Sequence, residues 1–468
     1  MRNLKLKATL VAVGVSVSYL AVPVQADPVA DWQAFAKKTG ETYHAEWANL
    51  IAAPEARALA KEWRDYRGYD ASSLVAAVEL PDELQPGLVI NKDNIDDYPW
   101  LSEYLPKPSA DRIRDGEWFG WKEVVIVPTN HYYMSRGVLE ETRDYHESGR
   151  KFTVNDKGEL LNDKGELALL KETAMPFPDP KTGLELAWLF MSYGIGNENL
   201  FLNPITFEVC DSANKLERTY TAHIWWQKMH GRKHIDPLTD VPGHKDVVEA
   251  GSVYFLDPYD VRGLAVSRQR YAEADRGDDF RAFLPSLRRT RILAGSDAQD
   301  PMAAGLEVTW DEWRQSWVKP DPRVFDYAIA GEGFVLAQPQ VGHAYAPVFR
   351  DESGCQIDRM ELELRPVWIL EVTDKTGNYM YSKRRMYVDK ELYYVVYQEM
   401  YDQRGNLWRV LDDARDWEPA TGLGMWENYV IWNTISKRWN YLNMDSDWDN
   451  YSNDISIQFD IDVLRDYR

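Results

Sequence analysis

The stretch ELYYVVYQEMYDQRGNLWRVL, residues 391–411, is typical of a β-hairpin with DQRGN as its turn. Gly405 supplies the positive φ that such a turn needs. A sheet with one face in water alternates apolar and polar residues, but both faces of the first arm are apolar here. Leu392, Tyr394, Val396 and Met400 point to one face, and Tyr393, Val395, Tyr397 and Tyr401 point to the other. The stretch therefore predicts a sheet that is covered on both faces.

The hairpin belongs to a long series of strand signals that begins near residue 184. Segments such as AHIWWQKM, RPVWILEVTD and NYVIWNTIS follow one another, and short turns such as DKTGN join the last of them. This order is typical of an antiparallel meander. Earlier in the chain, DPVADWQAFAKKTG and APEARALAKEWRDYRG carry apolar residues at helical spacing. We expect one β-rich domain over residues 27–468, with a helical region over about residues 27–110.

The first 26 residues have the three parts of an export signal. Arg2, Lys5 and Lys7 precede the apolar stretch ATLVAVGVSVSYLAV, and VQA ends at Ala26 with small residues where a signal peptidase cuts. No cysteine follows the apolar stretch, so a lipid attachment site is not expected. No later stretch has the ~18 apolar residues that a spanning helix needs. We expect cleavage after Ala26 and a soluble mature chain in the periplasm.

The charge of the chain excludes some classes of partner. The 468 residues carry a formal net charge of −21, which falls to about −24 once the three signal cations are removed. A chain this acidic is not expected to bind nucleic acid or anionic lipid headgroups. The chain is also rich in aromatic residues, with 19 tryptophans and 27 tyrosines. Such residues are common in sheets, in large interfaces and around apolar cavities.

The only two cysteines are Cys210 and Cys355. An exported chain lies in an oxidising compartment, where the two could form a disulfide. They are 145 positions apart, and the spacing alone does not say that they meet. Two buried thiols therefore remain the alternative to a disulfide.

Catalytic and metal-binding motifs are absent or incomplete. The sequence has no G-x-S-x-G, no H-E-x-x-H and no phosphate-binding loop. His230, His234 and His244 lie in a segment rich in glycine and proline, which favours a solvated loop over a metal site. The acidic segment at residues 445–454 lacks the glycine and glutamate of a calcium loop. We therefore expect no enzyme, no metal and no cofactor.

Arginines are concentrated in two segments, LDPYDVRGLAV and FLPSLRRTRIL. The residues are Arg262, Arg288, Arg289 and Arg291. Arginines in an apolar strand context need partners, because a buried unpaired charge is very costly. In the structural interpretation they pair with carboxylates such as Asp257 and Asp260, or with carbonyls. In the functional interpretation they form the charged rim of a cavity or a docking edge.

Four blocks of the sequence carry a resemblance to a known family. They are SVYFLDPYDVRGLAV, DDFRAFLPSLRRTRI, DPMAAGLEVTWDEW and RRMYVDKELYYVVYQEMYDQRGNLWRV. In this order they resemble the family called domain of unknown function 1329, which is also labelled outer-membrane lipoprotein-sorting-like. The resemblance covers roughly residue 176 to the C-terminus. It implies the fold of the periplasmic lipoprotein carriers: mainly β, with a strongly curved antiparallel sheet that forms an unclosed barrel and helices against its concave face.

The resemblance also implies a function, namely holding or moving hydrophobic, lipid-like molecules in the cell envelope. Such proteins are often encoded beside a resistance-nodulation-division exporter and an outer-membrane protein, which are the partners expected here. The apolar residues near the hairpin then become candidates for the lining of the cavity: Trp368, Leu370, Tyr394, Val396 and Trp408. Two solid cores, one on each face of the sheet, are the alternative to a cavity. A non-catalytic adaptor of an exporter assembly is the alternative function, and an envelope hydrolase is less favoured because the motifs are missing.

Overall fold

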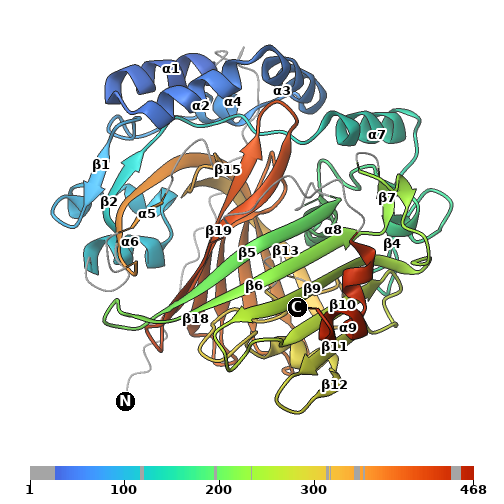
Figure 1. Cartoon of the computed structure of the whole chain (residues 1–468). Helices are drawn as coiled ribbons and strands as arrows, with labels where there is room; N and C mark the ends of the chain where they lie inside the picture. Colours follow the sequence, from blue (N-terminus) through green and yellow to red (C-terminus); the bar gives the residue numbers. More distant parts are fainter. Residues whose placement is uncertain are drawn as a thin grey trace, which may run out of the picture.

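A computed structural model describes residues 27–115, 121–193, 198–232, 235–312, 316, 318–341, 348–350, 354–443 and 455–467. Its main feature is a large, strongly curved sheet with helices on both faces (Figure 1). The signal segment at residues 1–26, His234 and the acidic segment at 445–454 lie outside the described residues.

The described strands cover most of the second half of the chain. Their bounds are β1 Val89–Asn91, β2 Trp121–Ile126, β3 Thr153–Val154, β4 Leu160–Leu161, β5 Asn199–Cys210, β6 Leu216–Lys228, β7 His230–Arg232, β8 Thr239–Asp240, β9 Val247–Asp257, β10 Ala265–Tyr271, β11 Asp279–Leu284, β12 Arg289–Ile292, β13 Phe325–Ala337, β14 Val348–Arg350, β15 Ile357–Asp374, β16 Lys383–Asp389, β17 Val395–Tyr401, β18 Leu407–Glu418, β19 Leu423–Asn433 and β20 Trp439–Asn443.

The main sheet is open, with β1 at one end and β12 at the other. Its order is β1-β2-β15-β16-β17-β18-β19-β20-β5-β6-β9-β10-β11-β12, and β13 and β14 also pair with β15. The pairs are antiparallel except for β2 and β15, which run parallel. The predicted fold class is therefore confirmed: the protein is mainly β, and its curved sheet forms an unclosed barrel with helices packed against it.

The helices have the bounds α1 Pro28–Thr39, α2 Thr42–Ala52, α3 Pro54–Arg67, α4 Ala71–Ala76, α5 Leu101–Tyr104, α6 Lys107–Asp115, α7 Arg136–Glu147, α8 Gly183–Tyr193 and α9 Ile461–Arg465. The side chain of Asp27 caps α1 by accepting from the Val29 N–H at 3.1 Å. Pro54 begins α3, and Gly68 follows its last residue, as the sequence predicts. Within the described residues, every helix is too short or too polar to cross a lipid bilayer.

The sheet bends around α8, so that two walls face each other across this helix (Figure 1). We call β5, β6 and β9–β12 the front wall, and β13 and β15–β18 the back wall. In Figure 1 the strands β5 and β6 lie in front, and β13 and β15 lie behind. The residues that face α8 form the inner face of the sheet, and the opposite face is the outer face.

The hairpin at residues 391–411 is part of the back wall, and both of its faces are covered. On the inner face, Met400 and Leu411 pack in one core with Met302 and Leu306. On the outer face, Tyr397 and Val410 pack in another core with residues of α5 and α6. The prediction of a sheet covered on both faces therefore holds for this stretch, and its turn has Gly405 at φ +81°.

The first arm of the hairpin is shorter than the sequence pattern predicts. β17 begins at Val395, because residues 390–394 form a turn in which Tyr393 has φ +58°. The Asp389 carboxylate holds this turn by accepting from the N–H groups of Glu391 and Leu392 at 2.7 and 2.9 Å. Alternation of apolar residues cannot reveal such a turn when the side chains of residues 391–394 are all buried.

A buried ionic network fixes the helical region to the back wall. Arg365 on β15 donates to Asp389 at 2.7 Å and to Glu391 at 2.8 Å. The Glu391 carboxylate also accepts from the N–H groups of Ala71 and Tyr132 at 2.8 Å each. Since these groups are almost completely buried, each charge depends on its partners. The network thus joins α4 and the segment before α7 to the sheet.

Cys210 and Cys355 form a disulfide with their Cα atoms 5.9 Å apart. Cys210 ends β5 in the front wall, and Cys355 lies just before β15 in the back wall. The bond therefore ties the two walls together at the point where the sheet bends.

Candidate functional site

Helix α8, with the sequence GLELAWLFMSY, fills the space between the two walls. Leu186, Leu189 and Phe190 pack against the back wall, and Trp188 turns toward a separate apolar cluster with Phe152 and Leu160. A helix that is apolar on all sides is typical of a buried position. α8 therefore acts as a plug in the hollow of the curved sheet.

The start of α8 lies against the backbone of β13. A Cβ atom at Gly183 would lie 2.4 Å from the Ala328 nitrogen and from the Tyr327 carbonyl carbon. Since only glycine fits at this distance, Gly183 fixes the N-terminal end of α8 to the back wall. The side of α8 that carries Trp188 and Met191 is packed less completely.

A cavity of about 90 Å³ lies between this side of α8 and the front wall. We call it the α8 cavity. Its lining is mostly apolar. The apolar residues come from α7, the segment 152–176, α8, β6, β9, the residue after β10 and the segment before β13: Val138, Phe152, Leu160, Ala168, Leu169, Ala174, Pro176, Trp188, Met191, Trp226, Val248, Ala272 and Pro320. A space lined in this way suits a largely apolar ligand, because ligand pockets are lined mostly by apolar side chains with a few polar groups among them.

The sequence repeat NDKGEL builds one side of the α8 cavity. In both copies an asparagine side chain closes the turn: Asn155 accepts from the Lys157 and Glu159 N–H groups, and Asn162 accepts from those of Lys164 and Glu166. The first turn also holds the plug helix, because Gly158 O accepts from Trp188 Nε1 at 2.8 Å. The repeat is thus a local extension that covers α8.

Charged residues also line the α8 cavity: Glu141, Glu172, Glu198, Lys228, Glu249, Arg270 and Lys319. Arg270 lies 3.5 Å from both Glu249 and Asp278, and Lys319 Nζ lies 3.3 Å from Asp278. Burial would raise the pKa of Asp278, but the charges of Arg270, Arg268 and Lys319 outweigh it and lower that pKa. Burial also lowers the pKa of the Lys319 ammonium. The cavity lining is therefore mixed, because charged side chains such as Arg270 and Lys319 stand beside the apolar ones.

A smaller hollow of about 30 Å³ lies on the other side of α8, against the back wall. Leu370, Val372 and Met386 supply its sheet side. Both hollows are lined by Met191 of α8 and by Pro320. Movement of α8 would therefore join the two spaces into one.

An open groove of about 570 Å³ lies outside the walls. It runs between α1, α4 and residues 126–129, and its apolar lining includes Phe35, Val75 and Leu84. This groove is larger than the α8 cavity, but it opens at the surface of the helical region and not between the walls.

The five residues predicted to line a cavity lie in or beside the back wall. Trp368 is buried and stacks on Tyr393, with ring centroids 6.3 Å apart. Tyr394 and Val396 are buried in the same core. Leu370 lines the 30 Å³ hollow, and Trp408 is half-buried beside Tyr381. None of the five is part of the lining of the α8 cavity.

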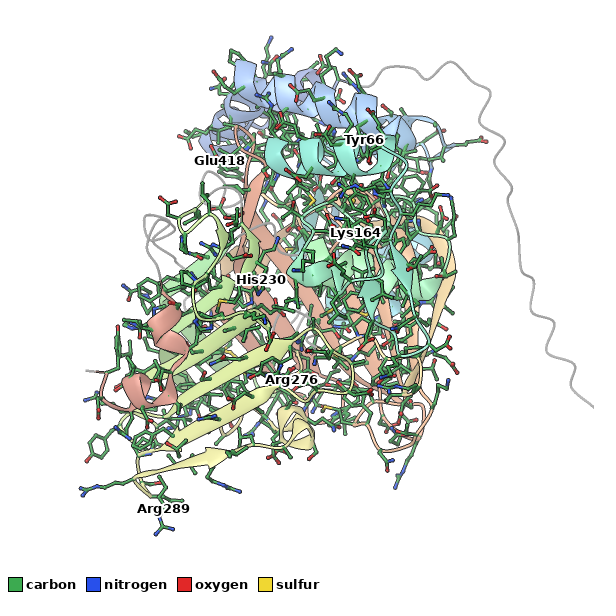
Figure 2. All side chains as sticks on the ribbon, turned by 90° about the vertical axis from the view of Figure 1, so that its right-hand side faces the viewer. Tyr66, Lys164, His230, Arg276, Arg289 and Glu418 are labelled. Carbon is green, nitrogen blue, oxygen red and sulfur yellow. A yellow bond between two sulfur atoms is a disulfide. The ribbon has the colours of Figure 1, made fainter. Side chains whose placement is uncertain are left out.

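The predicted arginines lie at the end of the front wall. Arg262 donates to the Leu256 carbonyl at 2.8 Å and lies 3.2 Å from Asp257, while Asp260 pairs with Arg218. Arg288, Arg289 and Arg291 are exposed, because β12 is the last strand of the sheet (Figure 2). The apolar neighbours in the sequence suggest burial, but an edge strand leaves these side chains in water.

The histidine segment contains no metal site within the described residues. His230 is occupied by other partners: it contacts Asp240 at 2.8 Å and the His244 carbonyl at 3.0 Å. Throughout the described ranges, no group of three or more histidine, cysteine and acidic side chains is arranged to hold a metal ion.

Sequence reasoning did not find the residues of the α8 cavity. They come from many separate segments between residues 137 and 320, and no single pattern connects them. One signal was available in α8 itself, since LELAWLFM is apolar on all sides and therefore predicts a fully enclosed helix.

Residues 89–465 match the family described as "Protein of unknown function (DUF1329)". The match covers most of the chain, which therefore belongs to this family. No curated protein is similar enough to count as a match.

Two solved structures share a low similarity with the chain. A DUF1329 family protein from Desulfovibrio piger is 16% identical, with a TM-score of 0.43, and the similarity covers 60% of this chain and 97% of that protein. A putative outer membrane lipoprotein-sorting protein domain from Vibrio parahaemolyticus is also 16% identical, with a TM-score of 0.39 and coverage of 57% and 92%.

Proposed function

We propose that this member of the DUF1329 family is a periplasmic binding or carrier protein for hydrophobic, lipid-like molecules. The observation that carries the proposal is the α8 cavity, a mostly apolar space between a plug helix and the front wall. The protein acts by binding a ligand, not by catalysis. The lining of the α8 cavity offers indole, phenyl and aliphatic groups. Contact between these groups and an apolar ligand removes apolar surface from water, which favours binding.

The size of the α8 cavity requires the plug to move. A volume of about 90 Å³ is smaller than the roughly 150 Å³ of an engineered cavity that binds benzene, and it is far too small for a lipid. Displacement of α8 would join this cavity with the 30 Å³ hollow, because both are lined by Met191. A ligand chain takes the place of α8 side chains, so the apolar surface of the walls stays covered in both states.

The charged side chains in the cavity lining set the orientation of the ligand. In this orientation the apolar part of the ligand lies beside Trp188 and Trp226, and the polar part of the ligand lies near Arg270 and Lys319. An amphipathic molecule placed in this way keeps its polar group close to charged partners, so that no polar atom is buried without a hydrogen bond.

The cellular setting is supported by the sequence. The export signal favours cleavage after Ala26 and a mature chain that begins at Asp27 in the periplasm. The family resemblance supports a place beside a resistance-nodulation-division exporter and an outer-membrane protein. In that place a carrier receives hydrophobic molecules from one partner or delivers them to the other.

Native mass spectrometry of the protein purified from the periplasm tests the proposal, with lipid extraction of the same sample. The expected result is a population with added mass, which organic extraction recovers as a hydrophobic molecule. The same spectrum reports the start of the mature chain. Only bare protein, in every preparation and after incubation with total envelope lipid, would be evidence against a carrier.

A second candidate function is a non-catalytic adaptor of an exporter assembly. The exposed end of the front wall at β12 favours it, since adaptors need a free surface for partners. A stable complex with the exporter in the absence of any bound hydrophobic molecule would favour the adaptor over the carrier.

A further inference from the structure

The front wall ends in a free strand, β12. Within the described residues, β12 pairs only with β11, through the pairs Arg281↔Ile292, Ala282↔Arg291, Phe283↔Thr290 and Leu284↔Arg289. All four residues of β12 are exposed. Arg289 projects from the end of the sheet in Figure 2.

The hydrogen bonds of β12 show which backbone groups are open. The Leu293 N–H donates to the Phe280 carbonyl at 2.8 Å. In an antiparallel ladder hydrogen-bonded pairs alternate with pairs that are not bonded, so Arg291 and Arg289 also bond to β11. The backbone N–H and C=O groups of Thr290 and Ile292 therefore point away from the sheet and can accept another strand.

The side chains of this edge have one sign of charge. Arg289 and Arg291 lie on the same face, and Arg288 precedes them in the turn. Within the described part of the chain, no carboxylate forms an ion pair with any of the three. The chain as a whole has a net charge of −21, so this cationic edge differs from the rest of the molecule.

Apolar residues are exposed beside the arginines. Ile292 is 79% exposed and Leu287 is 59% exposed. Charged residues on an edge strand often serve only to prevent aggregation, but that role does not need exposed apolar side chains next to them. The combination of open backbone groups, positive charge and apolar side chains is that of a recognition strand.

We propose that β12 is a docking edge that binds an extended acidic segment of a partner protein by strand addition. The added strand bonds to the open groups of Thr290 and Ile292, with acidic residues at every second position opposite Arg289 and Arg291. A second copy of this chain fits less well, because antiparallel pairing about Thr290 would place Arg289 opposite Arg291. This edge is separate from the α8 cavity and goes beyond ligand binding.

The test uses a fluorescent peptide of alternating glutamate and valine, with a lysine–valine peptide of equal length as its control. The full mature protein is titrated, and anisotropy measures binding. Wild type should bind the acidic peptide and not the basic one, and added salt should weaken the binding. Arg289→Glu/Arg291→Glu should weaken it about tenfold or more, because two attractive cross-strand pairs become repulsive.

Substitutions at Thr290 separate strand addition from simple charge attraction. Thr290→Pro removes an N–H that points away from β11, so the sheet keeps its own hydrogen bonds while the docked strand loses one. Binding should fall strongly in Thr290→Pro and remain in Thr290→Ala, which keeps the N–H. Circular dichroism checks the fold. If Thr290→Pro does not fold, an acidic peptide with N-methylated backbone amides decides the question, because it keeps its charges but cannot form the hydrogen bonds of an added strand.

Three outcomes would overturn the proposal. The first is no binding of the acidic peptide. The second is equal binding by Thr290→Pro and wild type, which would indicate charge attraction without strand addition. The third is that the arginine substitutions leave peptide binding unchanged, while the edge serves another partner. Arginine-dependent binding to phosphatidylglycerol vesicles would identify a membrane as that partner, and self-association that is lost in Thr290→Pro would identify a second copy of the chain. Binding of a hydrophobic probe to the same variants should be unchanged.

Discussion

The two walls of the sheet are built from similar strands but differ in what they enclose. The back wall carries apolar cores on both faces and borders only a hollow of about 30 Å³, and its buried charges at Arg365, Asp389 and Glu391 are paired. The front wall faces the α8 cavity and ends in an exposed strand. The difference teaches that the strands with the clearest apolar pattern build a scaffold, while the proposed ligand site lies on the wall that borders the larger of the two hollows beside α8.

The largest expected effect tests the solid packing of the back wall. Val395 and Val396 lie next to each other, point to different sides, and are both buried. A charge at either position has no partner, so Val395→Asp and Val396→Asp should each lower the free energy of unfolding by about 5 kcal/mol. Thermal melts compare the two. A small loss in only one of them would mean that the back wall also borders a hydrated space.

The covalent tie between the walls gives the next effect. Cys210→Ala/Cys355→Ala removes a link across 145 positions, which should cost about 3 kcal/mol because the unfolded chain becomes less restricted. Denaturant unfolding of the oxidised protein and the variant measures this difference. Two thiols that can be alkylated in the unreduced, unfolded wild type would show that the link is absent.

A smaller effect concerns the pH dependence of the back wall. Burial raises the pKa of Glu363 from 4.5 to about 7, against the opposing influence of Arg365. A carboxyl with a raised pKa in the folded state stabilises the fold most below pH 4.5, and this contribution is lost as the pH rises to 7. The free energy of unfolding of wild type should therefore exceed that of Glu363→Gln by a margin that shrinks as the pH rises from 4.5 to 7. An advantage that is constant with pH would contradict the assigned shift.

The sequence predicts the back wall better than the front wall, and the reason is physical. The hairpin at 391–411 is local, so its turn and its two apolar faces can be read from adjacent residues. The start of β17 was missed because Tyr393 adopts a left-handed conformation that depends on contacts with Asp389 and its neighbours. A sequence pattern therefore predicts an element well when residues close together in the chain determine its conformation.

The α8 cavity could not be predicted in the same way. Residues as distant as Val138 and Lys319 line it, and their meeting depends on the order of the strands and on the position of α8. The exposure of Arg289 and Arg291 also depends on the order of the strands in the sheet. The sequence pattern of a strand does not say whether that strand lies at the edge. The disulfide likewise depends on the bend that brings β5 beside the start of β15.

The central claim is that the hydrophobic ligand binds between α8 and the front wall. Ala174 lines the α8 cavity, and Ala337 is equally buried in the back wall. A leucine at either position adds the same atoms, but only the first has space for them. Ala337→Leu should cost about 1–3 kcal/mol through overpacking, and Ala174→Leu should cost less.

The most direct measurement is a titration of wild type, Ala174→Leu and Ala337→Leu with N-phenyl-1-naphthylamine, a hydrophobic dye that fluoresces when it is bound. The proposal predicts that wild type and Ala337→Leu bind the dye, and that Ala174→Leu stays folded but does not bind it. Unchanged binding by Ala174→Leu would place the ligand elsewhere, for example in the groove beside α1. No binding by wild type would contradict the carrier function itself.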